Sequence, residues 1–287
     1  MVPIGIIFIM VCVFGGYMVS GGKIEIILEA APHELLTIVG AAIGLTIVGN
    51  KLSVIKKLGY IFKKAMKGPA FKQDEYKDLL CTLFLLCKLI KSKGMIAIEQ
   101  HIEKPEESTI ILQFPSLLKD HFAIDLICDT LRTMTMGMEN PHQIEDLIDK
   151  AIEKHHHEAA APAHILQTMA DSLPAIGIVA AVLGIIKTMA SIDQPPKILG
   201  AMIGGALVGT FMGVFLAYCF VGPLYNKANQ TLEEEQQFYF IIRDVLVAHL
   251  KGAAPQVSLE IGRSNVPSSY QPTFLELEEV TSNLKFE

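Results

Sequence analysis

Charge is scarce in this chain, and four long stretches have none at all. The 287 residues include 24 Lys and Arg and 30 Asp and Glu, which is 19% charged with a net charge of −6. A disordered acidic chain would carry more charge, and a general nucleic-acid binder would carry the opposite sign. No charged residue occurs at positions 1–22, 35–50, 172–186 or 198–226. Because apolar residues reach 51%, more than one soluble core of this size usually holds, these stretches indicate membrane-spanning segments.

Cysteine is also sparse and shows no ligand spacing. The five cysteines are scattered and none lies in a CxxC pair: Cys12, Cys81, Cys87, Cys128 and Cys219. An odd, scattered set argues against a disulfide framework and against a zinc site, and free thiols fit a reducing, cytosol-facing protein. A cleaved signal peptide is a poor interpretation of the first stretch, because no basic segment precedes it.

The four uncharged stretches predict two transmembrane hairpins. A helix needs roughly 20 apolar residues to cross a bilayer, and stretches 1–22 and 198–226 meet this alone. The second can extend back through His33 and Glu34 to the interface, and the third can reach about Ala190 if Lys187 snorkels to the headgroups. We predict an all-α membrane protein with one hairpin in residues 1–50 (spans about 2–20 and 33–50) and another in 172–225 (spans about 172–190 and 198–222). A buried amphipathic helix is the alternative for the two shorter stretches.

Lysines beside the spans indicate the orientation. Six of them follow the second span with no acid before Pro69, whereas segment 21–32 has one Lys and two Glu. By the positive-inside rule the lysine-rich side is cytoplasmic, so both termini are expected inside. The large segment 51–171 is then a cytoplasmic domain, and 226–287 is a cytoplasmic helical tail with a mobile end beyond Gly262.

The cytoplasmic domain is expected to be helical throughout. Apolar residues at helical spacing predict helices over about 79–93, 95–102 and 116–136, with stops at Gly94 and Gly137. Asn140, Pro141 and Gln143 resemble a capping box that starts a helix directed at the third span. That helix is either a mechanical link to the membrane or one that merely ends there. In the tail, a helix is expected to continue to about Lys251 and stop at Gly252.

Small residues occur at helical spacing in the last two spans. Such residues let membrane helices approach closely, either within one chain or between subunits. The third span has Pro174, Gly177, Ala181 and Gly184 on one face, and the fourth has Gly205, Gly209 and Gly213 in a GxxxGxxxG pattern. Pro174 and Pro223 each remove an N–H that would bond to the carbonyl four residues earlier, which predicts a kink or hinge in each span.

Acidic side chains are missing from all four uncharged stretches. Proton relays through membranes use Asp, Glu or His between helices, so an ion-moving chain of this kind would need a partner to supply the titrating group. Thr210 is then the best polar side chain to face that group. The alternative is a hydroxyl bonded back to the carbonyl of residue 206.

A run of histidines raises the question of a metal site. His155, His156 and His157 are consecutive, with Glu158 and His164 nearby. Consecutive helical residues point about 100° apart and cannot all meet one ion. We therefore interpret this segment as a solvated interfacial helix.

Several strings carry a resemblance to a known family. They are ADSLPAIGIVAAVLG at 170–184, GALVGTF at 205–211 and GPL at 222–224. With the spacing of the four spans, they make the chain similar to the MotA family of flagellar motor stator subunits, in the MotA/ExbB/TolQ superfamily. The resemblance covers nearly the whole chain. It implies a multi-pass protein of the bacterial inner membrane that is not an enzyme and has no cofactor.

The resemblance also implies partners and residue roles. Subunits of this family form a homopentamer around a MotB-like chain whose single span carries an aspartate, and ion flow past it turns the rotor protein FliG. Pro174 and Pro223 match the family's functional prolines, and Thr210 matches the threonine near the partner's aspartate. Sodium-driven relatives have a threonine where this chain has Ala181, which favours protons. Lys91 and Glu99 match the rotor-contacting charges, although the family often has Arg at the first position.

Two other functions compete with this interpretation. The ExbB and TolQ energising subunits resemble the chain but have three spans, whereas the first hairpin here supplies a fourth. A secondary transporter would place polar or charged groups at its own midplane, and the uncharged stretches lack them.

Overall fold

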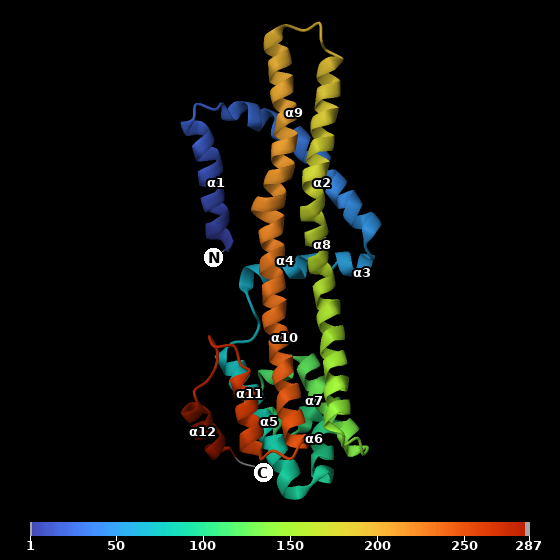
Figure 1. The fold of residues 1–287 in the computed structure, drawn as a ribbon, viewed down its shortest axis with the longest axis vertical. Coiled ribbons are helices and arrows are strands. Elements are labelled where there is room, and N and C mark those ends of the chain that lie inside the picture. The colour runs from blue at the N-terminus through green and yellow to red at the C-terminus, as the bar shows by residue number, and fades with distance from the viewer. Residues whose placement is uncertain (1, 285–287) are drawn as a thin grey trace. The chain divides into compact units, whose positions relative to one another are not determined.

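The computed structural model describes residues 2–284, and within that part every regular element is helical (Figure 1). This confirms the all-α class. In chain order the main helices are α1 (Val2–Val19), α2 (Ile24–Gly49), α3 (Leu52–Ile55), α4 (Leu58–Lys67), α5 (Gln73–Lys93), α6 (Glu99–Glu103), α7 (His121–Thr135), α8 (Pro141–Met189), α9 (Pro196–Leu216), α10 (Gly222–Leu250), α11 (Pro255–Ser264) and α12 (Phe274–Asn283). Short turns fill the gaps: η1 (Met95–Ile98), η2 (Pro105–Glu107), η3 (Ile111–Gln113), η4 (Leu117–Lys119) and the π-turn η5 (Ala217–Val221).

The chain forms two compact units. The first joins the residues up to Gly68 to Ala159–Thr231, and the second joins Pro69–Glu158 to the residues from Leu232 onward. The boundaries between them fall inside α8 and α10, so each of these helices contributes residues to both units.

Four helical segments that lie wholly or partly in the first unit are long and apolar enough to cross a membrane. They are α1, α2, α8 and the run from α9 into α10. The helix of the second predicted span begins at Ile24 and runs through Pro32, so it starts well before position 33. A small core lies between α2, α8 and α9: Ile38, Ala42, Leu173, Ala180, Val208, Met212 and Ala217. None of the residues of α1 is buried, and its Phe14 meets Phe215 edge to face at 5.5 Å.

The second unit has a conventional apolar core. It is built on α5, which contacts α11 and α12, and on the part of α10 that begins at Leu232. The ring of Phe71 stacks on that of Phe238 at 3.8 Å. Helix α5 ends at Gly94, whose φ of +82° lies in the region that favours glycine.

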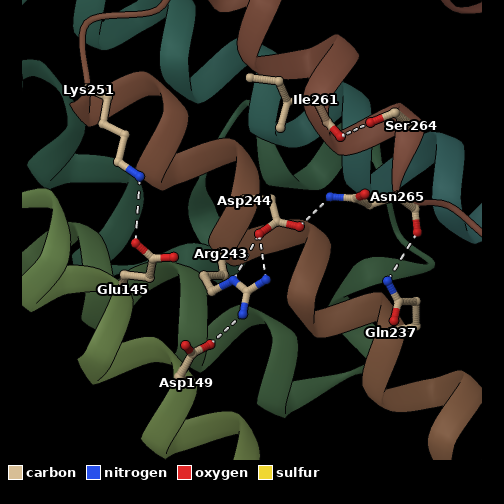
Figure 2. Close-up of polar contacts among 9 residues, drawn as sticks. All are labelled: Glu145, Asp149, Gln237, Arg243, Asp244, Lys251, Ile261, Ser264 and Asn265. Carbon is tan, nitrogen blue, oxygen red and sulfur yellow. Dashed lines mark hydrogen bonds and ion pairs between the residues drawn. The ribbon is translucent and has the colours of Figure 1, made fainter.

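Polar contacts join α8, α10 and α11 in this unit (Figure 2). Arg243 Nη1 donates to Asp149 at 2.7 Å, and its Nε donates to Asp244 at 2.8 Å. Asp244 also accepts from Asn265, and Lys251 pairs with Glu145 at 3.6 Å. The part of α8 up to Glu158 is therefore held to the core of the second unit by ion pairs as well as by apolar packing.

Three local expectations differ from the structure. The helix expected over 116–136 is divided, because Asp120 caps α7 by accepting from the Ala123 amide at 3.2 Å. The Asn140 side chain accepts from the His142 amide at 3.0 Å, and the expected reciprocal bond from Gln143 does not form within residues 2–284. Positions 274–283, in the segment expected to be a mobile end, form α12 with a capping box between Thr273 and Glu276.

Candidate functional site

The seam between α8 and α9 is a contact between backbones. A Cβ added to Gly213 would lie 2.6 Å from the Leu173 carbonyl oxygen and 2.8 Å from the Gly177 Cα. A Cβ added to Gly177 would lie 2.9 Å from the Gly209 carbonyl oxygen. Side chains cannot occupy such spaces, so close approach of the two helices requires glycine at Gly177 and Gly213.

The same seam continues toward the loop between α8 and α9. A Cβ on Gly184 would lie 2.7 Å from the Ala206 Cβ, and one on Gly209 would lie 3.3 Å from the Ala181 amide nitrogen. Ala181 is 6% exposed. The structure thus places Gly177, Ala181 and Gly184 on one face of α8, as the spacing predicted.

Helix α2 packs against another side of α9. Ile26 Cγ2 lies 3.3 Å from a Cβ built on Gly204, and Ala30 Cβ lies 3.6 Å from one built on Gly205. One turn further along α2, Glu34 Oε2 would lie 2.7 Å from a Cβ on Gly209. The glycines of α9 therefore serve two helices, and Gly209 is where α2, α8 and α9 meet.

The structure brings an acid to the seam that the uncharged stretches do not contain. The second span was expected to extend back through Glu34 to the interface, and the charge pattern did not indicate a contact between Glu34 and α9. In the structure its carboxylate rests on Gly209, in the middle of the GxxxGxxxG run. A signal was available in the four-residue spacing of Ile26, Ala30 and Glu34, but Pro32 and the nearby charges obscured that face.

Thr210 follows Gly209 and is half-buried. Other threonines of the first unit donate their hydroxyl to the carbonyl four residues earlier, as Thr46 does to Ala42 and Thr188 to Gly184, both at 2.9 Å. No such bond to Ala206 forms at Thr210 in the part of the chain that the structure describes. Its hydroxyl is therefore available to a group outside this chain.

The two prolines differ in their surroundings. Helix α8 continues through Pro174 as one uninterrupted helix. Pro223 instead follows the π-turn η5, in which the Gly222 amide donates to the Ala217 carbonyl, five residues earlier. Since Pro223 cannot donate to Cys219, the helix is irregular at that point.

Lys91 and Glu99 lie in the second unit and are both exposed. Lys91 is in the last turn of α5 and Glu99 begins α6. Burial, followed by the charge of Lys91, lowers the pKa of the His249 imidazole. The two residues thus belong to a solvated edge that a charged partner could reach.

The histidine run and the cysteines are the remaining candidate groups. The His155 ring stacks on Phe122 at 3.7 Å, and no group of three metal-ligating side chains occurs within residues 2–284. All five cysteines are free. Burial raises the pKa of the Cys87 and Cys128 thiols to about 12, so both remain protonated and unreactive.

Comparisons with known proteins cover most of the sequence. The family described as Motility protein A N-terminal matches residues 3–94, and the MotA/TolQ/ExbB proton channel family matches residues 120–239. The chain is 39% identical to motility protein A of Salmonella typhimurium over 97% of its own length and 94% of that protein. It is equally identical to the Escherichia coli motility protein A over the same shares, and 38% identical to the chemotaxis protein LafT of Vibrio parahaemolyticus over 96% of each chain.

Two solved structures share the fold. The chain of the C. jejuni MotAB structure matches with a TM-score of 0.72 at 17% identity, covering 93% of this chain and 95% of that one. A chain of the MotAB stator complex from Bacillus subtilis matches with a TM-score of 0.67 at 22% identity, covering 96% and 97%.

Proposed function

Because this chain belongs to the MotA/TolQ/ExbB proton channel family and is an ion-conducting stator subunit of the flagellar motor, we propose that it conducts protons past an aspartate held by a partner. The observation that supports this most directly is at the glycine seam. There Thr210 has a hydroxyl without a partner among the described residues, beside the meeting point of α2, α8 and α9.

The partner we propose is a MotB-like chain with a single span. Two solved structures of similar fold are complexes named MotAB. As the family resemblance implies, the aspartate of such a partner would face Thr210. We further propose a homopentamer of this chain around the partner, in contact with membrane lipid. Large apolar side chains on α8, such as Ile178, Val182 and Ile186, are exposed and available for both contacts.

Ala181 favours protons as the transported ion. Its methyl group offers no oxygen to replace the water that a sodium ion would lose, whereas a proton needs only a titrating group. Swimming speed should therefore follow the proton-motive force and ignore external sodium. Measuring speed in media of equal pH with and without sodium tests this, and a loss of swimming on sodium removal would contradict it.

The location we propose is the bacterial inner membrane with both termini in the cytoplasm. Membrane helices and family membership support the inner membrane. The orientation rests on the lysines of segment 51–67, which the positive-inside rule assigns to the cytoplasm. The second unit would then present Lys91 and Glu99 to the rotor protein FliG.

Thr210 gives the direct test of the pathway. Replacing Thr210 with Val keeps the shape but removes the hydroxyl, so we expect torque to fall strongly while the complex still assembles. Thr210→Ser retains the hydroxyl and should preserve much of the torque. Swimming speed and co-purification of the partner are the measurements. Normal swimming of the Val variant would remove Thr210 from the mechanism.

The sequence of the co-purifying chain tests the proposed partner. A chain with one predicted span that contains one aspartate is the expected result. A purified subunit that conducts protons at full rate without any partner would contradict the proposal.

A further inference from the structure

Glu34 is an acid of this chain that the proposed pathway does not yet use. Its Oε2 occupies the space over Gly209, 2.7 Å from where a Cβ would be. Thr210 is the next residue along α9. The side chains of consecutive helical residues point about 100° apart, so the Glu34 carboxylate lies at the same level of α9 as Thr210 but on a neighbouring face.

The helix positions place this acid beside the uncharged stretches of α8 and α9. Gly209 lies beside Ala181, and Lys187 comes six residues later on α8, which is about 9 Å along a helix axis. Gly209 also follows Ile198, the first residue of the uncharged run, by eleven residues, or about 16 Å. Glu34 thus contacts α9 about 16 Å into its uncharged run, next to a part of α8 that is also uncharged. An ionisable group at such a depth is costly and is expected to have a function.

Among the described residues, Glu34 makes no polar contact that would give it a structural role. Within residues 2–284 its carboxylate forms no hydrogen bond and no ion pair. The titratable groups that influence it are His33 on its own helix and Lys187 on α8. Helix α9 brings no titratable side chain close to Glu34, because its one ionisable residue, Lys197, is twelve residues from Gly209, about 18 Å along the axis.

Glu34 differs from the other titratable residues in the first half of α2. Glu25 and Glu29 are exposed and precede Glu34 on α2. His33 is exposed as well. Glu34 is instead half-buried and contacts the glycine seam at Gly209, so Glu29 can serve as an exposed control on the same helix.

We propose that Glu34 is a proton-binding residue of the pathway on its outer side, a role that rests on the proposed function. A proton from water forms an O–H bond on the Glu34 carboxylate. The bond then breaks as the proton passes to the partner's carboxylate, directly or through water, and Glu34 returns to its charged form. No oxidation or reduction takes place. Gly209 is required here because any side chain would displace the carboxylate.

Three variants of the full chain, each produced with its partner, test the proposal. Glu34→Gln keeps the size but cannot exchange a proton, Glu34→Asp keeps an acid on a shorter arm, and Glu29→Gln is the matched control on the exposed side of α2. The measurements are proton uptake by vesicles that contain the complex and swimming speed across external pH. Loss of a proton-transfer group typically lowers a rate by about 10²-fold or more, so flux through Glu34→Gln should fall severely. Glu34→Asp should conduct with a displaced pH profile, and Glu29→Gln should match the wild type.

A merely structural Glu34 would give a different pattern. Glu34→Gln with the flux and pH profile of the wild type would overturn the proposal. Should Glu34→Gln fail to co-purify with the partner, the Asp variant decides, because an unchanged pH profile in an assembled complex also overturns it. The proposed function fails separately, if the wild-type complex carries no protons or if replacing the partner's aspartate with asparagine leaves the flux intact.

Discussion

At the residue scale, the seam between α8 and α9 depends on glycines, which have no side chain. Gly177 and Gly213 meet at distances that no Cβ occupies. In lipid, apolar side chains gain little by leaving the acyl chains, so close backbone packing supplies much of the association. The GxxxGxxxG pattern predicted close helix packing, either within one chain or between subunits, but not which helix would meet which glycine.

Replacing Gly213 with Ala should open the seam. The new methyl group would meet the Leu173 carbonyl at 2.6 Å, and such overpacking costs about 1–3 kcal/mol. We expect a lower unfolding midpoint in SDS and reduced swimming. Gly200→Ala is the matched control on the same helix, because nothing lies within 4 Å of its Cβ position. It should be neutral or stabilising by up to about 1 kcal/mol through helix propensity. Equal midpoints for the two variants would contradict the packing argument.

Glu34 shows what reasoning from residue types did not reach. The charge-free stretches located the spans, and the second span was expected to begin near position 33, but the charges did not indicate what Glu34 contacts. The structure shows that α2 continues past Pro32 and Glu34. Helix packing decides which face of α2 meets α9, and a charge pattern along one helix does not contain that information.

At the element scale, the segment between α5 and α7 is held by side chains rather than by a long helix. It consists of η1, α6, η2, η3 and η4. His101 Nδ1 and Ser108 Oγ lie 2.8 Å apart, and Ser108 Oγ also accepts from the Ile111 amide at 3.3 Å. Both side chains are buried. Helical periodicity predicted a helix near 95–102, but it could not predict this polar anchor.

The contact between His101 and Ser108 makes the stability of the fold depend on pH. Burial, and then the charge of Lys93, lowers the pKa of His101 below its ordinary value of 6.5. The unfolded chain therefore takes up a proton first, and the contribution of His101 to stability is present above pH 6.5 and is lost as the pH falls below it. One proton changes the unfolding free energy by at most about 1.4 kcal/mol per pH unit.

We expect His101→Asn to remove part of this acid sensitivity, although the variant starts from a lower stability. Thermal unfolding of the purified full-length protein between pH 7.5 and pH 5 measures the slope, with pH values chosen around the ordinary histidine pKa. His121→Asn is the control, because His121 is exposed. The lowered pKa of His249 adds sensitivity of the same sign, so some slope should remain. An unchanged slope in the His101 variant would contradict the argument.

At the scale of the whole molecule, the sequence predicted the helical class and the four membrane helices but not the division into units. The prediction followed the chain as hairpin, domain, hairpin and tail. The structure instead groups distant segments, since the residues from Leu232 onward share a core with Pro69–Glu158. Phe71 on Phe238 and Arg243 on Asp149 are examples of these contacts. Local periodicity shows which face of a helix is apolar. It does not show which other helix packs against that face.

This division predicts separable defects in rotation and ion flow. Lys91 and Glu99 are in the second unit, whereas Thr210 and Glu34 are in the first. Reversing the charges with Lys91→Glu or Glu99→Lys would set like charges against a complementary rotor surface, which costs up to several kcal/mol. We expect swimming to fail while cytoplasmic acidification through the complex continues. The exposed Lys150 supplies a control, since Lys150→Glu makes the same charge change in that unit and should swim normally. Unaffected motility in both reversal variants would argue against a rotor contact there, and a joint loss of ion flow would show that these residues act on the pathway itself.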